Sequence, residues 1–162
     1  MYDKGSYVSY GGHGICQISD IRSMDFGNGI GQREYYVIQP IAPGSATIYL
    51  PAGNSNVQKK MRPVLTQEEI DSIIHSVKND EMPWVLDRKL RLAQFHQILS
   101  RRETRELLLL ASCLHQRSME KGLSGSELDI LHRAEGIIEQ EFAFSLQIGR
   151  EKIGEYIQDK LK

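Results

Sequence analysis

The sequence predicts an α+β protein in two domains, with a β-rich first half and an all-helical second half. In roughly the first 65 residues, short segments rich in Val, Ile, Tyr and Thr show partial alternation, which favours strands. From Thr66 onward, apolar residues recur at helical spacing instead. We therefore expect one domain over residues 1–66 and a second over residues 67–162, the latter starting with a short helix and linker over residues 67–83.

The first half contains several short strand segments separated by glycines. The run Phe26-Gly27-Asn28-Gly29-Ile30-Gly31 carries the Asn-Gly signal of a tight hairpin. Several short strands within this length predict a small, strongly bent sheet or partial barrel. The expected strands lie within residues 6–10, 14–24, 33–41 and 46–51.

Four amphipathic helices and a helical tail are expected in the second half. Three capping boxes, in which a hydroxyl and a later carboxylate satisfy first-turn amides, are predicted at Thr66/Glu69, Ser100/Glu103 and Ser124/Glu127. Gly122 is well placed to end the third helix. The apolar residues that mark the helices are Ile70, Ile73 and Ile74; Leu92, Phe95, Ile98 and Leu99; Leu107, Leu108, Ala111 and Leu114; and Leu128, Leu131, Ile138, Phe142 and Leu146. Residues 149–162 continue or follow the fourth helix.

Trp84 occupies an unusual position for the only tryptophan of the chain. Pro83 disfavours helix in Met82 and suits the first turn of a helix, so we expect Trp84 at a helix start and exposed. A core tryptophan more often lies inside an apolar periodic run. A structural role and a contact role therefore both remain open from the residues alone.

The charge distribution singles out the region after Trp84. The formal net charge is -1, which disfavours a general nucleic-acid binder, but residues 84–121 carry eight basic and four acidic side chains. Arg88, Lys89 and Arg91 follow Trp84 closely. A flat apolar side chain beside phosphate-binding cations suits a contact in the DNA minor groove, although a solvated helix face has the same composition.

Catalytic, metal and phosphate-loop signals are weak, so we expect no catalytic residues, no metal and no cofactor. His13/Cys16 and Cys113/His115 supply zinc ligand types at unsuitable spacings, and no nucleophile elbow is present. The glycine run at residues 27–31 lies between strands rather than opening a helix. The cysteines fall in different predicted domains, so no disulfide is expected.

No apolar run approaches the length that a membrane span requires, the longest being Leu107–Ala111. We expect a soluble, cytoplasmic protein without a membrane partner.

Several motifs resemble the CarD/CdnL family of bacterial transcription regulators, whose N-terminal module also occurs in transcription-repair coupling factor. In the first half these motifs are Lys4-Gly5-x-x-Val8-x-Tyr10-Gly11-Gly12-His13-Gly14, Tyr35-Tyr36-Val37-Ile38, Ile48-Tyr49-Leu50-Pro51 with Asn54, and Met61-Arg62-Pro63-Val64. In the second half they are Trp84 followed by Arg and Lys, and Glu120-Lys121-Gly122-Leu123-Ser124-x-x-Glu127.

The resemblance implies a Tudor-like N-terminal module that binds the RNA polymerase β subunit and a helical domain that contacts promoter DNA. The DNA contact would lie in the minor groove at the upstream edge of the minus-ten element and stabilise the open complex. By position, Trp84 would be the wedge and Arg88, Lys89 and Arg91 the phosphate contacts. The polymerase-facing residues would be Met24, Phe26, Ile48 and Tyr49. Such a protein would not be an enzyme, would act as a monomer when bound, and would join the nucleoid through polymerase.

Two rival functions remain from the sequence. A protein-only adaptor would bind polymerase without touching DNA, and would show no salt-dependent DNA term. A small hydrolase or metal enzyme would require bound metal or a catalytic grouping that the motifs do not indicate.

Overall fold

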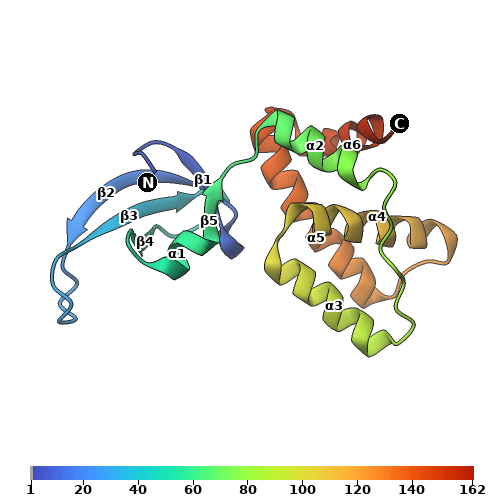
Figure 1. Cartoon of the computed structure of the whole chain (residues 1–162), viewed down its shortest axis with the longest axis horizontal. Helices are drawn as coiled ribbons and strands as arrows, with labels where there is room; N and C mark the ends of the chain where they lie inside the picture. The colour runs from blue at the N-terminus through green and yellow to red at the C-terminus, as the bar shows by residue number, and fades with distance from the viewer. Residues whose placement is uncertain (1) are drawn as a thin grey trace. The chain divides into compact units, whose positions relative to one another are not determined.

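The structure, a computed structural model, describes residues 2–162 and contains a five-stranded antiparallel sheet followed by helices (Figure 1). The chain divides into two compact units: an N-terminal one that ends at Val64 and a helical one, Leu65–Lys162. The prediction of a β-rich part followed by helices is confirmed.

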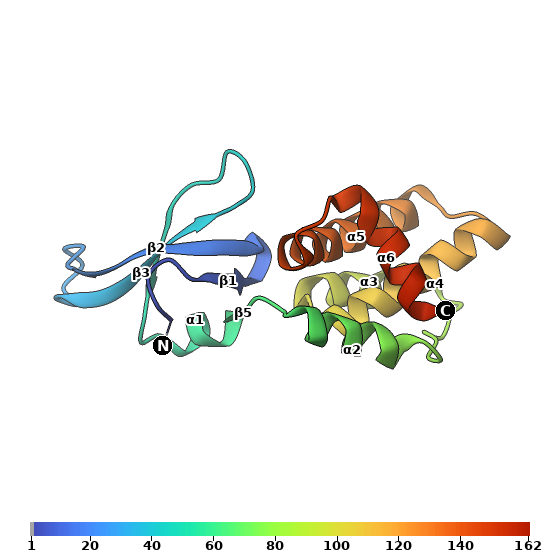
Figure 2. The same ribbon diagram turned by 90° about the horizontal axis from the view of Figure 1, so that it is seen from above.

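The N-terminal unit is an open sheet with the strand order β4-β3-β2-β1-β5. Figure 2 shows its two longest strands, β2 and β3, side by side. Every neighbouring pair is antiparallel, and the sheet does not close between its edge strands β4 and β5. The pairing of β2 with β3 shifts register between Ile18 and Asp20, a bulge that increases local twist. The strands are β1 (Tyr7–Tyr10), β2 (Ile15–Met24), β3 (Arg33–Pro40), β4 (Ile48–Pro51) and β5 (Met61–Pro63).

One face of this sheet carries its principal core. Strand alternation brings side chains of every strand to that face, where the helix α1 (Ser55–Lys60) also contributes Val57. The buried members are Val8, Cys16, Ile18, Tyr36, Ile38, Leu50, Ala52, Val57 and Met61.

The tight Asn-Gly hairpin expected at residues 26–31 is wrong. Met24 pairs with Arg33, so a loop of residues 25–32 joins β2 to β3. Gly27, Gly29 and Gly31 all adopt positive φ there, and the side chain of Asp25 accepts a hydrogen bond from the amide of Gly27 at 2.8 Å. Repeated left-handed residues with local side-chain bonds form a wide loop rather than a two-residue turn.

The short elements after β4 were missed from the sequence. Asn54 caps α1 through its side chain, which accepts bonds from the amides of Asn56 and Val57. The strand β5 follows directly and pairs with β1. Neither segment is long enough to show a hydrophobic period, so pattern analysis overlooked both.

The helical unit consists of five α-helices and one 3-10 turn packed around a single core. The helices are α2 (Gln67–Val77), α3 (Arg88–Arg101), α4 (Thr104–Glu120), α5 (Gly125–Leu146) and α6 (Ile153–Leu161), with the 3-10 turn at Arg150–Lys152. The core includes Ile70, Phe95, Leu107, Leu114 and Phe142, all nearly inaccessible to solvent. The predicted tail helix therefore follows the fourth helix as a separate element, α6.

Two of the three predicted capping boxes are present. Thr66 and Glu69 form one at α2, and Ser124 and Glu127 form one at α5. Gly122 adopts φ +80° and its amide bonds to the carbonyl of Arg117, which ends α4 as predicted.

The third capping box, at Ser100, is wrong. Ser100 lies inside α3, which runs on to Arg101 and stops at left-handed Arg102. Glu103 is itself the N-cap of α4, and its carboxylate accepts bonds from the amides of Arg105 and Glu106. The side chain of Glu103, three residues after Ser100, therefore caps α4 in place of the serine.

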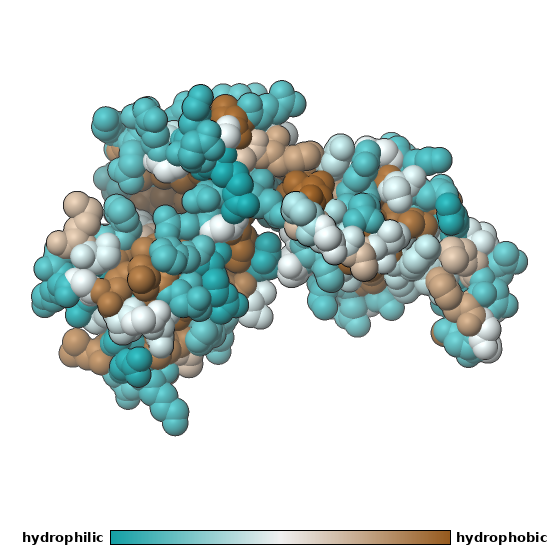
Figure 3. Space-filling view, turned by 180° about the vertical axis from the view of Figure 1, so that it is seen from behind, coloured by the Kyte–Doolittle hydropathy of each residue, from teal (hydrophilic) through white to brown (hydrophobic). Residues whose placement is uncertain are grey.

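The surface of the face shown in Figure 3 is mostly hydrophilic, with separate hydrophobic areas rather than one continuous band. Within residues 2–162, no helix is long and apolar enough to cross a membrane.

Candidate functional site

Trp84 does not start a helix, contrary to the sequence prediction. Residues 81–87 are non-helical, and α3 begins only at Arg88 because Asp87 is its N-cap, accepting a bond from the amide of Leu90 at 3.1 Å. Trp84 thus lies in a non-helical segment ahead of the cap. We call residues 82–90 the Trp84 segment.

The indole of Trp84 is half-buried rather than fully exposed. It packs on the edge of the helical core, with its ring 6.2 Å from that of Phe95. The guanidinium carbons of Arg117 and Arg91 lie 4.1 and 4.4 Å from the indole centroid, both over the ring. Two cations therefore contact the proposed wedge residue within the protein itself.

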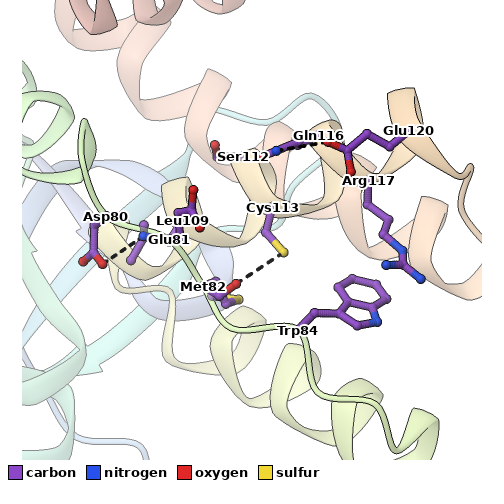
Figure 4. Close-up of a pocket in the computed structure, with 10 residues that line it drawn as sticks. All are labelled: Asp80, Glu81, Met82, Trp84, Leu109, Ser112, Cys113, Gln116, Arg117 and Glu120. Carbon is purple, nitrogen blue, oxygen red and sulfur yellow. Dashed lines mark hydrogen bonds between the residues drawn. The ribbon is translucent and has the colours of Figure 1, made fainter.

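A small pocket adjoins Trp84. It has a volume of about 160 Å³, and Figure 4 shows Trp84 extending from the segment toward Arg117 of α4 at its margin. The thiol of Cys113 lies 3.9 Å from the carbonyl oxygen of Met82, and Glu120 accepts a bond from Gln116. The pocket is mixed in chemistry and borders the segment without enclosing the indole.

Arg91 is buried, and its guanidinium is occupied within the helical unit. Its Nε lies 3.4 Å from Oε2 of Glu127, and neither atom has a hydrogen-bond partner among residues 2–162. Its Nη1 donates to the carbonyls of Val85 and Leu86 at 2.8 and 3.3 Å. This placement favours a positioning role for Arg91 over the phosphate contact implied by the resemblance.

Glu127 combines two structural roles, N3 of the α5 capping box and partner of Arg91. Burial raises the pKa of its carboxyl, but hydrogen bonds with Ser124 and the charges of Arg91 and Arg117 outweigh that effect, so the pKa lies below its ordinary value. The carboxylate is therefore ionised at neutral pH. It holds Arg91, and through Arg91 the Trp84 segment, against the start of α5.

Arg88 and Lys89 are exposed in the first turn of α3, where no acidic residue accompanies them. Cations at a helix N-terminus oppose the helix dipole, so these two side chains do not stabilise α3. Leu86 and Leu90 are also exposed beside them. The segment thus presents cations together with apolar side chains.

Sequence reasoning missed two residues of this site, Arg117 and Leu86. Nothing in the sequence links Arg117 to Trp84, because 33 positions, including the whole of α3, separate them. Leu86 did carry a signal: it is an apolar residue outside any periodic run and next to the cap residue Asp87.

A second candidate surface lies on the N-terminal sheet, on the face opposite its principal core. Phe26, from the loop, packs edge-on against Tyr35 and Tyr49, with ring centroids 4.9 and 5.9 Å apart. We call these three residues the outer-face cluster. Phe26 is 51% exposed and Tyr49 42%, whereas Tyr35 is buried.

The other two predicted polymerase-facing residues divide between the faces. Met24 pairs with Arg33 and shares the face of the outer-face cluster by strand alternation. Ile48 pairs with Ile38 and packs against the principal core. Met24, Phe26 and Tyr49 therefore lie on the outer face of the sheet, while Ile48 lies on the core-facing side of the edge strand β4.

A group of three charged side chains lies on the same face as the cluster. Arg22 donates to Asp20 at 2.6 Å, and Lys4 lies 3.7 Å from the same carboxylate. The hydrogen bond from Arg22 is the main cause that holds the pKa of Asp20 below its ordinary value. The apolar cluster thus has a polar neighbour on its sheet face.

The cysteine and histidine residues considered as metal ligands do not gather. Cys16 is buried in the sheet core, His13 stacks on Tyr10, and Cys113 belongs to the helical unit. In the part of the chain from Tyr2 to Lys162, no group of three or more His, Cys, Asp or Glu side chains could hold a metal ion.

Comparison with known proteins identifies the N-terminal part of the chain. Residues 2–65 match the family model described as the CarD-like/TRCF RID domain. No curated protein matches the chain. The matched range coincides with the sheet unit and contains the whole outer-face cluster. Residues 2–65 are therefore identified as a CarD-like/TRCF RID domain, a protein-interaction domain that indicates an RNA polymerase-interacting, transcription-related protein.

Proposed function

We propose that the protein is a transcription regulator that docks on the RNA polymerase β subunit and contacts promoter DNA through the Trp84 segment, stabilising the open complex. The observation that carries this proposal is the family match over residues 2–65 together with exposed cations and apolar side chains in the Trp84 segment. Each unit then contributes one interface.

The docking interface is proposed to include the outer-face cluster and the free side of β4. Edge strands offer unpaired backbone groups that can receive a further strand, and aromatic side chains are enriched at protein interfaces. Phe26 and Tyr49 are exposed aromatics beside that edge. This arrangement suits a protein partner, because exposed aromatic rings lie beside a charged group made up of Arg22, Lys4 and Asp20.

The DNA interface is proposed at the upstream edge of the minus-ten element. Arg88 and Lys89 would contact phosphates, and Trp84 would lie against a base step in the minor groove. Because Arg117 and Arg91 cover the indole in the free protein, Trp84 would have to exchange these cation contacts for base contacts on binding.

Coupling between the interfaces follows from tethering. The overall charge is -1, so intrinsic DNA affinity should be weak, and docking on polymerase raises the effective concentration of the Trp84 segment near DNA. A contribution of about 1.4 kcal/mol to the open state would shift the opening equilibrium about tenfold.

The docking half of the proposal is tested by affinity for the purified β-subunit lobe. Tyr49→Ala should weaken binding about tenfold or more, as expected for an aromatic side chain that becomes buried at the proposed interface. Ile41→Ala is the matched control, since Ile41 is exposed to a similar degree, 40% against 42% for Tyr49, but is not part of the cluster. Equal affinity of the parent and Tyr49→Ala would contradict this docking surface.

The DNA half is tested by the lifetime of open complexes formed with purified polymerase. The Arg88→Ala/Lys89→Ala variant should shorten the lifetime, and the effect should diminish as salt rises. Arg133→Ala, which removes an exposed cation from α5, is the control. Trp84→Ala should also shorten the lifetime.

A protein-only adaptor is the second candidate function. It is favoured by the burial of Arg91 and by the cation contacts that already occupy Trp84. This alternative predicts normal β-subunit binding, and open-complex lifetimes that none of the Trp84 segment variants alters.

A further inference from the structure

Leu86 is the most exposed large hydrophobic side chain among residues 2–162, with 89% of its surface accessible. Isolated exposed leucines are common on proteins and require no explanation by themselves. Leu86 differs because the backbone around it is held by buried groups. The fixed backbone therefore holds the Leu86 side chain in water.

The backbone at Leu86 is fixed from both sides. Nη1 of Arg91 donates to the carbonyls of Val85 and Leu86, and the next residue, Asp87, caps α3. Arg91 is itself held by the buried carboxylate of Glu127. We call this arrangement the Arg91 clamp.

The Arg91 clamp is costly to build. Burying an arginine and a glutamate requires removing two charges from water, and such pairs often stabilise a fold no better than apolar residues would. A buried ion pair that fixes a turn is therefore better explained by the conformation that it imposes. Here that conformation directs one backbone segment outward and exposes Leu86.

The surroundings of Leu86 indicate the chemistry of its partner. Arg88 and Lys89 are exposed within three residues of it, and the one acidic neighbour, Asp87, has its carboxylate engaged as the N-cap of α3. Leu90, one turn further, is also exposed. An apolar side chain followed closely by two exposed cations fits the base edges and phosphates of a DNA minor groove, where leucine can insert between base steps.

We propose that Leu86 is a second apolar DNA contact, presented to the minor groove by the Arg91 clamp. This inference rests on the proposed function and extends it. In the free protein the guanidiniums of Arg91 and Arg117 lie over the Trp84 ring, whereas the Leu86 side chain is exposed to solvent. Leu86 makes the first apolar contact, and Trp84 follows when its cation contacts are released.

The test compares Leu86→Ala with Met119→Ala in full-length protein. Met119 is 77% exposed on α4 and serves as the matched control for removing an exposed apolar side chain. Neither variant should change the melting temperature. Leu86→Ala should shorten the open-complex lifetime about tenfold, the effect of losing the burial of one leucine side chain, and Met119→Ala should leave it unchanged.

A second variant tests the clamp. Arg91→Lys retains the positive charge, but a single ammonium cannot take the place of both Nη1, which bonds the two carbonyls, and Nε, which faces Glu127, so it should shorten the lifetime in the parent background. In the Leu86→Ala background its effect should be smaller than in the parent, because the part that acts through Leu86 is then absent, while the contact of Arg91 with the Trp84 indole is altered in both backgrounds.

Failure of this inference is distinguishable from failure of the proposed function. If Arg88→Ala/Lys89→Ala and Trp84→Ala shorten the lifetime while Leu86→Ala equals the parent, the role of Leu86 is overturned and the DNA contact stands. If Leu86→Ala weakens binding to polymerase without DNA, Leu86 is a protein contact and the inference is overturned. If all these variants equal the parent, both proposals fail.

Discussion

The outer-face cluster and the Trp84 segment both expose apolar side chains, but they are supported in different ways. The cluster is built on hydrogen-bonded strands, and its rings support one another edge-on. The Trp84 segment is neither helix nor strand over residues 81–87, and its backbone at Val85 and Leu86 is held by the buried Arg91 clamp. The first surface is maintained by local pairing, and the second by a remote ion pair.

This difference relates to the proposed partners. A protein interface can rely on shape and apolar area, and the outer-face cluster offers aromatic rings on a sheet. A nucleic-acid interface needs cations near apolar side chains, and cations repel one another and oppose a helix N-terminus. A segment of this kind needs external support, which Glu127 supplies from α5.

The largest expected effect comes from removing that support. Glu127→Ala leaves the buried guanidinium of Arg91 without its carboxylate and removes the N3 residue of the α5 capping box. We expect a loss of about 3–5 kcal/mol in unfolding free energy. Trp84 is the single tryptophan, so its fluorescence during denaturation reports on the helical unit.

Phe26→Ala provides the contrasting measurement for the cluster. Because Phe26 is half-exposed on a loop, its removal should cost less than about 1 kcal/mol. Similar costs for Phe26→Ala and Glu127→Ala would abolish the distinction between locally and remotely supported surfaces.

The next effect concerns the cations. Arg88→Ala and Lys89→Ala should each reduce the slope of log affinity against log salt by about one in binding to a promoter fragment held by polymerase. Arg91→Ala should instead lower stability with little change in slope, because its guanidinium is buried. A slope change for Arg91→Ala equal to that for Arg88→Ala would show that Arg91 reaches phosphate.

Much of the fold could be predicted because the period of the apolar residues changes at Thr66. Strands β1 to β4 and helices α2 to α5 all fall on the predicted segments, since each is long or regular enough to show its period. The helix α1 and the strand β5 were missed because the run of residues 54–63 joins a short, mostly polar helix directly to a three-residue strand and so shows neither period. A tight hairpin was predicted at residues 26–31 from one Asn-Gly pair, but three glycines at positive φ give this segment the conformation of a wider loop.

The candidate site was less accessible to sequence reasoning. Arg88, Lys89 and Arg91 are chemically alike and close in sequence, yet helical geometry exposes the first two and buries the third. Which of the three cations is buried depends on Glu127, which lies 36 positions after Arg91 and which no local sequence pattern connects to it. Tertiary ion pairs of this kind decide which cations remain available for a partner.

A smaller effect is expected from acid. The pKa of Glu127 is lowered in the folded protein, so its stabilising contribution is present above the ordinary glutamate range near pH 4.3 and is lost as pH falls through the lowered folded value. The melting temperature followed by Trp84 fluorescence should decline in that range. Glu127→Gln should flatten the decline.

The flattening in Glu127→Gln should be partial. Asp80 and Glu106 also have pKa values below their ordinary ones, chiefly through hydrogen bonds from Arg105 and Arg101, and both remain in the variant. An acid limb identical to that of the parent would contradict an ionised, stabilising Glu127.

The smallest effects separate the two serines that looked alike in sequence. Ser124 accepts a bond from the amide of Glu127 and starts the helix that carries the clamp, so Ser124→Ala should cost about 1 kcal/mol. Ser100 lies exposed inside α3, so Ser100→Ala should be neutral or slightly stabilising, because alanine is the better helix former. Thermal denaturation followed by Trp84 fluorescence measures both. Equal costs would mean that Ser100 also acts as a cap, and that the boundary between α3 and α4 lies earlier than Arg102. A larger cost for Ser124→Ala than for Ser100→Ala would show that the capped start of α5, which carries Glu127, contributes to the support of the Trp84 segment.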